Sequence, residues 1–320
     1  MYTTLSISQV QAARERIAPH VRHTPLVSLP SPQGNMPPQL RLKLENLQVT
    51  GSFKARGAFN NLLQLSAQQL AQGIVTASGG NHGLAIAYAA AQLRTAATVY
   101  IPETASADRE ARIAAWGAQV IRFGSNPSDA LAQARAHGAA AGLAFIHPFD
   151  AIRTLEGTGT LGLELLDDLP DIDYLLVAIG GGGLISGMAA AIKQQKPHVR
   201  IIGVEPVGAA SMHAAVEAGH VVELADVRTI ADTLAPRAVC DLTLGLTQQY
   251  VDEIILVDDR QMVLAMRWLW AECNQLVEPA GAAVIAALQS GAITIPRDAA
   301  PVALICGGNA AAESVFQHYS

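Results

Sequence analysis

The segment Tyr174-Leu-Leu-Val-Ala-Ile-Gly-Gly-Gly-Gly-Leu184 joins an apolar run to four consecutive glycines, and it decides how the chain folds. The uncharged stretch 174–192 is about long enough to cross a bilayer as a helix. Glycines at its centre would make that helix poor, because glycine loses much backbone entropy on becoming helical. The apolar run has the length of a buried parallel strand. The segment therefore predicts a strand, a glycine loop and a helix.

The same alternation continues on both sides of this segment. Further strands are expected at residues 73–78, 97–101, 118–123, 144–147, 199–204, 253–257 and 301–305, and helices at 84–93 and 107–116. Such alternation predicts parallel sheets with helices on both faces, which is an α/β fold. Residues 31–38 are rich in proline and are expected to form an exposed loop.

Composition and charge limit the classes of function. The chain has 320 residues, of which 50% are hydrophobic and 15% charged, so it can bury a large core in about two lobes. Its net charge of -6 and the absence of a Lys/Arg cluster argue against nucleic-acid binding. A small molecule is therefore the expected partner.

The N-terminal sequence and the cysteines indicate a cytoplasmic protein. Arg14-Glu-Arg16 stands where a signal peptide would need an apolar core. Few, widely separated cysteines predict reduced thiols rather than a disulfide framework or a zinc cluster. The chain has three of them, Cys240, Cys273 and Cys306.

A second stretch, Lys43-Leu-Glu-Asn-Leu-Gln-Val-Thr-Gly-Ser-Phe-Lys54-Ala-Arg-Gly-Ala58, joins a lysine to the loop that would position it. The hydroxyls of Thr50 and Ser52 could cap the start of a helix. A helix N-terminus favours the neutral amine, which is the form that attacks aldehydes. The stretch therefore predicts that Lys54 forms a Schiff base.

Three shorter motifs are each open to more than one interpretation. Gly180 to Gly183 would let backbone N–H groups approach a phosphate, although a nucleotide-binding turn or a tight corner would also need glycines. A Walker loop is excluded because no Gly-Lys-Ser/Thr follows, and no acidic ribose partner stands out for NAD. Asn81, in Ser78-Gly-Gly-Asn-His-Gly83, is also an ordinary turn residue, and Cys306 could be a small core residue.

Taken together, the lysine stretch, residues 78–83, residues 180–184 and Cys306-Gly-Gly-Asn309 resemble the fold type II pyridoxal-phosphate (PLP) enzymes, which are tryptophan synthase β-like. The resemblance is to the threonine/serine dehydratase branch, which includes proteins similar to serine racemase, and it spans about residues 22–309. It implies two lobes, each with a mainly parallel sheet flanked by helices. Residues 1–66 and 149–320 would form the large PLP-binding lobe and residues 67–148 a small mobile lobe, with no regulatory domain.

The resemblance also implies roles for residues at matching positions. Lys54 would carry the Schiff base and act as the catalytic residue, with Phe53 beside it. The phosphate would be bound by Gly180, Gly181, Gly182, Gly183 and Leu184. The pyridine ring would contact Asn81 through its hydroxyl, Glu278 at its edge and Cys306 at its nitrogen. The substrate would contact Ser78, Gly79, Gly80, Asn81 and His82.

Three departures from the family pattern restrict the expected chemistry. Gly79 stands where racemases have a serine that transfers a proton, so efficient racemisation is not expected. An acidic residue six positions after Glu205, as in cation-dependent relatives, is replaced by Ser211, so no metal site is predicted. Thr158 replaces a glutamine that is more often seen, and no chemical role is assigned to it.

The expected function is therefore a PLP-dependent dehydratase, or ammonia-lyase, that converts a β-hydroxy amino acid to a 2-oxo acid and ammonia. L-Threonine and L-serine are the first candidates for the substrate. The alternatives are a bulkier substrate such as phenylserine or 3-hydroxyaspartate, then a serine racemase, a β-replacement synthase or a non-catalytic PLP-binding protein. The protein is expected to assemble as a homodimer or homotetramer, away from membranes.

Overall fold

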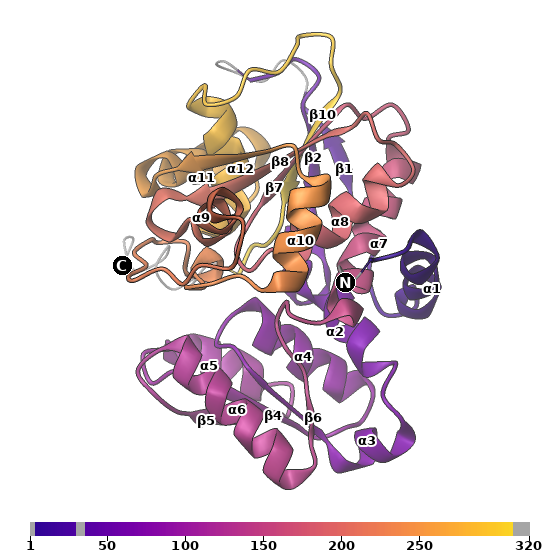
Figure 1. Cartoon of the computed structure of the whole chain (residues 1–320), viewed down its shortest axis with the longest axis vertical. Helices are drawn as coiled ribbons and strands as arrows, with labels where there is room; N and C mark the ends of the chain where they lie inside the picture. The colour runs from indigo at the N-terminus through magenta and orange to yellow at the C-terminus, as the bar shows by residue number, and fades with distance from the viewer. Residues whose placement is uncertain (1–3, 30–35, 310–320) are drawn as a thin grey trace.

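The computed structural model describes residues 4–29 and 36–309, and these form two sheets with their own helices (Figure 1). The six-stranded sheet has the order β1-β2-β10-β7-β8-β9, and the four-stranded sheet has the order β5-β4-β3-β6. All neighbouring strands run parallel except β1 and β2, which are antiparallel. The predicted α/β class with mainly parallel sheets is confirmed.

The strands of the larger sheet are β1 (Leu26–Ser28), β2 (Arg41–Leu44), β7 (Tyr174–Ala178), β8 (Arg200–Pro206), β9 (Glu253–Val257) and β10 (Pro301–Ile305). Those of the smaller sheet are β3 (Ile74–Ala77), β4 (Ala97–Ile101), β5 (Gln119–Arg122) and β6 (Ala144–Phe145). The strands expected from the apolar runs are thus all present, with ends that differ by a few residues.

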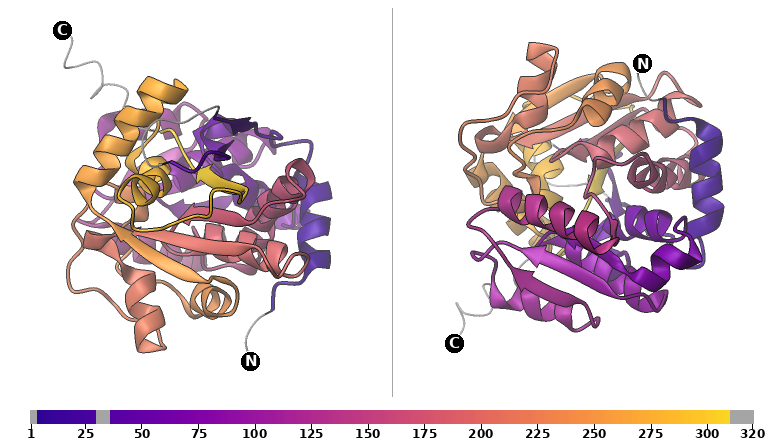
Figure 2. Two further views of the ribbon diagram at one scale, coloured as in Figure 1. Left: turned by 90° about the horizontal axis from the view of Figure 1, so that it is seen from above. Right: turned by 60° about the horizontal axis from the view of Figure 1, so that its bottom comes forward.

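The helices near the smaller sheet are α3 (Ala67–Gln72), α4 (Asn81–Gln92), α5 (Ala107–Ala114) and α6 (Pro127–Ala141). The others are α1 (Ile7–Ile17), α2 (Lys54–Leu62), α7 (Ile152–Asp168), α8 (Gly183–Lys193), α9 (Ser211–Ala218), α10 (Asp241–Tyr250), α11 (Asp259–Cys273) and α12 (Pro279–Gln289). Short 3-10 turns are η1 (Glu45–Leu47), η2 (Val49–Gly51), η3 (Val207–Ala209) and η4 (Asp232–Leu234). Figure 2 shows the two sheets with their helices from two further sides.

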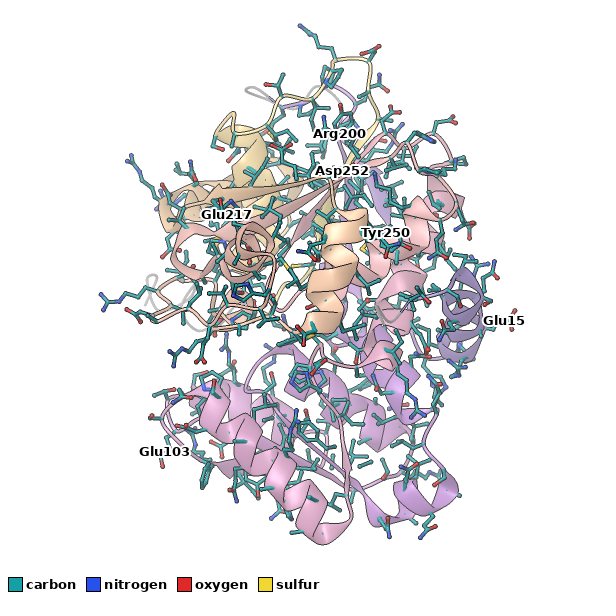
Figure 3. The ribbon with its side chains drawn as sticks, viewed as in Figure 1. Glu15, Glu103, Arg200, Glu217, Tyr250 and Asp252 are labelled. Atoms are coloured by element: carbon teal, nitrogen blue, oxygen red, sulfur yellow. The ribbon has the colours of Figure 1, made fainter. Side chains whose placement is uncertain are left out.

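The elements follow from simple sequence features. β7 lacks the alternation of apolar and polar residues that a half-exposed strand shows, because both of its faces are covered. Its last four residues are buried. α12 packs against β7, β8, β9 and β10, and α8 packs against α7. Charged side chains such as Glu15, Glu103 and Glu217 lie on the outside (Figure 3). None of the helices in the described part of the chain is long and apolar enough to cross a membrane.

Three expectations about local structure need correction. The strands β1 and β2 were not expected, because Arg41 and Lys43 interrupt the apolar pattern of β2. α4 begins at Asn81, three residues before the expected start at 84. Of the loop expected at 31–38, residues 31–35 lie outside the described residues, whereas Met36 and residue 37 are buried rather than exposed.

The four-stranded sheet and helices α3 to α6 all fall between residues 67 and 148. Everything in the six-stranded sheet falls before or after that range. The lobe borders at 66/67 and 148/149, and the mobility of the smaller lobe, stay predictions.

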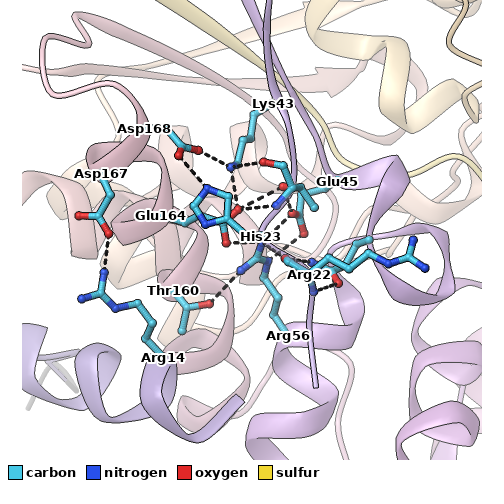
Figure 4. Close-up of polar contacts among 12 residues, drawn as sticks. Arg14, Arg22, His23, Lys43, Glu45, Arg56, Thr160, Glu164, Asp167 and Asp168 are labelled. Carbon is cyan, nitrogen blue, oxygen red and sulfur yellow. Dashed lines mark hydrogen bonds and ion pairs between the residues drawn. The ribbon is translucent and has the colours of Figure 1, made fainter. Parts of the chain in front are cut away.

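A buried network of charges explains how Lys43 can occupy a strand (Figure 4). The Lys43 ammonium lies 2.6 Å from Glu164 Oε1 and 2.7 Å from Asp168 Oδ2. Arg56, on α2, donates to both oxygens of Glu45 at 2.9 and 2.7 Å, and to Glu164 at 2.8 Å. The network therefore fixes the start of α2 against β2 and α7.

The same network brings possible metal ligands together. Ligand atoms of His23, Glu164 and Asp168 lie within 4.8 Å of one another. Because Lys43 already contacts both carboxylates, its ammonium holds the place that a cation would take.

Candidate active site

Lys54 is the first residue of α2 and follows a loop in which two residues have positive φ angles. Thr50 has φ 64° and Gly51 has φ 75°, and a Cβ added at Gly51 would lie 2.5 Å from Asn309 Oδ1. The predicted hydroxyl cap is wrong, because the helix start has no side-chain cap. Instead the hydroxyls of Thr50 and Ser52 are buried without a hydrogen-bond partner among the described residues.

The Lys54 amine is held in a poorly solvated position. Its Nζ donates to the Pro148 carbonyl at 3.2 Å and lies 5.1 Å from the centre of the Phe53 ring. Burial lowers the pKa of Lys54 to about 8, although the nearby Glu278 acts to raise it. The Lys54 amine is therefore neutral more often near neutral pH than the amine of an exposed lysine, which favours its action as a nucleophile.

Asn81, Glu278 and Asn309 form a continuous polar chain beside this lysine. The Asn81 amide donates to Glu278 Oε1 at 2.7 Å, and its carbonyl oxygen accepts from Asn309 Nδ2 at 2.7 Å. Burial raises the pKa of Glu278 to about 7. These two hydrogen bonds bring together segments that are 197 and 228 residues apart in the sequence.

Cys306 follows β10 directly and is buried. Its carbonyl accepts from the Phe53 amide at 3.2 Å, which attaches the loop before Lys54 to the carboxyl end of the central strand. Burial raises the pKa of the Cys306 thiol, so the thiol is neutral. The position therefore offers a weakly polar group near the lysine.

The glycine loop between β7 and α8 has no room for side chains. Gly182 has φ 84°, and a Cβ at Gly181 would lie 2.4 Å from the Phe149 ring. The Thr158 hydroxyl donates to the Gly183 carbonyl at 2.7 Å and so fixes the start of α8, which also includes Leu184. Pro148 and Phe149 connect this loop to Lys54.

The loop 78–80 lies between β3 and α4. The Gly80 amide donates to Ser78 Oγ at 3.2 Å. A Cβ at Gly79 would lie 3.3 Å from Ala105 Cβ, so the missing side chain does not leave open space there. A pocket opens at the loop, and its lining consists of Gly79, Gly80, Asn81, Leu84, Arg109, Arg112, Ile113, Thr233 and Asn309.

His82 does not face that pocket. Its Nε2 lies 3.0 Å from the Thr76 hydroxyl, and burial keeps its pKa well below the usual value. His147, whose pKa is lowered to about 4 by burial, accepts from the amides of Phe149 and Asp150 through Nδ1. Both rings are therefore neutral near pH 7. The substrate contact expected of His82 stays a prediction, and it concerns the backbone N–H group rather than this ring.

Glu205 is buried at the end of β8, and its two oxygens accept from the amides of Met212 and His213 at 2.9 and 2.8 Å. Burial raises the pKa of Glu205 to about 7. The carboxylate thus caps the start of α9. Nearby, the hydroxyl of Ser211 is buried without a partner among the described residues.

These features fit a phosphorylated pyridine aldehyde. The lysine amine has a lowered pKa, and a helix N-terminus follows a loop of glycines, where backbone N–H groups favour an anion. The glycine loop and Cys306 follow β7 and β10, which are parallel neighbours, so both lie at the carboxyl edge of the large sheet. This edge is the usual ligand position in parallel α/β sheets. In the loop before Lys54, the buried Ser52 hydroxyl has no partner among the described residues, so it is free to bind a polar group of a ligand.

Sequence reasoning missed several residues of this site. Pro148 and Phe149 contact the lysine and the glycine loop, and Arg109, Arg112 and Thr233 line the pocket. Asn309 was quoted in a motif without a role. The arginines lie three positions apart on α5, which was a visible signal that they share a helix face.

Comparison with known proteins identifies the family. Residues 17–307 match the family described as pyridoxal-phosphate dependent enzymes, so the chain belongs to this family. It is 38% identical over 305 residues to an L-threonine ammonia-lyase of Geobacter sulfurreducens, covering 95% of this chain and 76% of that protein. It is 37% identical over 317 residues to a phenylserine dehydratase of Ralstonia pickettii, covering 99% and 97%.

A solved structure agrees with this assignment. The structure of maize serine racemase superposes with a TM-score of 0.94 at 34% identity, covering 99% of this chain and 97% of the other. The predicted family, fold type and PLP cofactor are therefore confirmed. The roles of individual residues stay predictions.

Proposed function

We propose that this protein dehydrates β-hydroxy amino acids to 2-oxo acids and ammonia, with L-threonine and L-serine as its first substrates. It is a PLP-dependent lyase of the ammonia-lyase type, and the similar L-threonine ammonia-lyase supports the choice of threonine. The observation that carries the proposal is the Lys54 amine, at a helix start with its pKa lowered to about 8.

Lys54 would perform the proton transfers. Bound PLP supplies an aldehyde that captures the substrate amino group and a ring that accepts electrons. The Lys54 amine, once free, is the base that removes the α-proton, and the protonated amine then donates to the departing β-hydroxyl. Water and an amino-acid enamine result, and the enamine hydrolyses to the 2-oxo acid and ammonia.

The other residues would bind and orient. We assign the phosphate to the amides of residues 180–184 and the substrate carboxylate to the N–H groups at the start of α4. Asn81 and Glu278 would meet the ring of the cofactor, and the neutral Cys306 thiol would lie at its nitrogen. A neutral partner does not enforce protonation of that nitrogen, which favours prompt elimination over a persistent carbanion.

A bulkier substrate is the second candidate, because a phenylserine dehydratase is 37% identical along nearly the whole chain. Racemisation ranks lower because Gly79 has no side chain to transfer a proton. The proposal also includes a cytoplasmic location and an assembly of two or four copies. The three cysteines are free in the structure, as expected for reduced thiols.

The test is a panel assay of the PLP-loaded protein with L-threonine, L-serine, phenylserine and 3-hydroxyaspartate. We expect a visible absorbance band from the bound cofactor and release of 2-oxo acid. A band without any 2-oxo acid would contradict dehydration and would fit a racemase or a non-catalytic PLP protein. Release of 2-oxo acid only when a thiol acceptor is absent, with a new amino acid formed in its presence, would indicate a β-replacement enzyme.

A further inference from the structure

The pocket beside the loop 78–80 contains two arginines in different electrostatic states. Arg109 and Arg112 both lie on α5 and line the pocket together with Gly79 and Asn81. Arg109 forms an ion pair with Asp232, and this hydrogen bond raises the pKa of Arg109. Its charge is therefore balanced by a neighbouring carboxylate.

Arg112 is half-buried and has a neutral partner instead. Its Nη2 donates to Asn309 Oδ1 at 2.6 Å, and it forms no ion pair with any residue between 4 and 29 or between 36 and 309. Asn309 in turn donates to Asn81, which donates to Glu278. Arg112 thus brings to the pocket a positive charge that has no paired carboxylate within the described ranges. The Asn309 side chain alone separates it from Asn81, the predicted contact of the cofactor ring.

A carboxylate would be a better partner for Arg112 than the Asn309 amide. The present hydrogen bond joins the Arg112 charge to a neutral amide, whereas a carboxylate would add the attraction between two opposite charges. A guanidinium also matches the two oxygens of a carboxylate in geometry. The pocket has about 10 Å³ of free space, so an anion fills it only when Arg112 releases Asn309. Its long side chain allows that movement.

We propose that Arg112 forms a subsite for a second, distal carboxylate, so that the protein accepts β-hydroxy amino acids of the 3-hydroxyaspartate class besides threonine. The proposal rests on the dehydratase function above. The substrate α-carboxylate would bind the N–H groups of the loop, and the side-chain carboxylate would reach Arg112. Arg109 and Asp232 would form the neutral wall of this subsite.

The test uses substrates that differ in charge but not in shape. We expect kcat/KM for 3-hydroxyaspartate to exceed that for 3-hydroxyasparagine by at least about 10-fold, since a hydrogen-bonded charge pair supplies that discrimination. Arg112→Met should remove this preference, with a loss of about 10- to 100-fold for 3-hydroxyaspartate. It should lower kcat/KM for 3-hydroxyaspartate more than kcat/KM for threonine, because threonine lacks the distal charge. Arg112→Lys should retain part of the preference.

Arg200→Met is the matched control, because Arg200 is an exposed arginine on β8, in an ion pair with Glu253. It should leave all ratios unchanged. Equal kcat/KM for the acid and the amide in the wild type would overturn the subsite. An equal loss for threonine in Arg112→Met would also overturn it, since Arg112 would then bind the α-carboxylate or support the fold.

A binding measurement separates this inference from the proposed function. α-Methylaspartate and α-methylasparagine have no α-proton, so the change in cofactor absorbance reports binding alone. Tighter binding of α-methylaspartate, lost in Arg112→Met, would support the subsite even if no β-hydroxy amino acid were dehydrated. Equal binding of the two compounds would overturn the subsite while leaving threonine dehydration intact.

Discussion

At the scale of single residues, the site depends on groups whose protonation differs from that in water. Burial lowers the pKa of Lys54 to about 8 and raises that of Glu278 to about 7. The two groups lie in one site, and each moves toward its neutral form because the protein interior disfavours charge. Such opposed shifts are typical of catalytic sites.

Lys54→Ala should fold but lose both the visible band of bound PLP and the release of 2-oxo acid, because it removes the amine that would form the Schiff base. Absorbance spectra and an assay with L-threonine measure this. Lys196→Ala, at a lysine that contacts the Pro170 carbonyl, is the control and should behave as the wild type. Turnover by the Lys54 variant would contradict the mechanism.

Glu278 should make the stability of the cofactor-free protein depend on pH. The pKa of Glu278 is about 7 in the folded protein and near 4.5 in the unfolded chain. Between these two pH values the carboxyl group is therefore protonated in the folded protein and ionised in the unfolded chain. The stability that this carboxyl contributes is complete below about pH 4.5 and is lost as the pH rises through about 7, by on the order of 3 kcal/mol.

Glu278→Gln should remove that loss. Urea unfolding at several pH values would measure it as a difference in free energy of unfolding, wild type minus variant, that falls between pH 4.5 and 7. A difference that stays constant over this range would contradict the buried neutral carboxyl. Using the difference cancels the opposite contributions of His82 and His147, whose pKa values are lowered.

At the scale of secondary structure, the start of α2 is held by buried charges rather than by a helix cap. Arg56, two residues after Lys54, is 1% exposed and bridges Glu45 and Glu164. Removing one partner of a buried pair is costly because the remaining charge stays buried without compensation. The ion pairs of Arg56 therefore connect the helix that begins at Lys54 to η1 and α7.

Arg56→Met should lower the free energy of unfolding by about 3–5 kcal/mol. Arg14→Met is the control, because Arg14 pairs with Asp167 at the surface and such pairs contribute about 0–1 kcal/mol. Urea unfolding would compare the two variants. Equal effects would mean that the buried network does not support α2 as described.

At the scale of the whole molecule, side chains of α5 connect the elements around the four-stranded sheet to those around the six-stranded sheet. Arg109 pairs with Asp232 of η4, and Arg112 donates to Asn309 after β10. Both partners belong to the part of the chain that carries the large sheet. These contacts would close the smaller lobe over the pocket, if it moves as predicted.

Asp232→Asn should weaken that closure, because it replaces an ion pair by a hydrogen bond from the charged Arg109 to a neutral amide. Amide hydrogen exchange should become faster in α5, which contacts the edge strand β5, while α3, which contacts β6 at the opposite edge of the same sheet, should not change. Unchanged exchange in α5 would show that the Arg109 contact does not hold the two parts together. Faster exchange in both helices would indicate general destabilisation instead.

The sequence by itself determined the features that depend on neighbouring residues. Apolar runs of strand length, the glycines at 180–183 and the lysine stretch 43–58 are local patterns, and each predicts its own backbone. From them followed the α/β class, all the parallel strands except β2, and the lysine at a helix start. The error at the cap of α2 arose because Thr50 and Ser52 point into the protein rather than to the helix.

Only the tertiary structure decided where charges could be buried. Lys43 reads as a surface residue, yet Glu164 and Asp168, more than 100 positions later, make β2 a buried strand. Likewise Arg112 meets Asn309 across 197 positions, and Asn81 meets Glu278 across another 197. A charged side chain is stable inside only beside its partner. Local sequence cannot supply that partner, because the fold brings it from elsewhere in the chain.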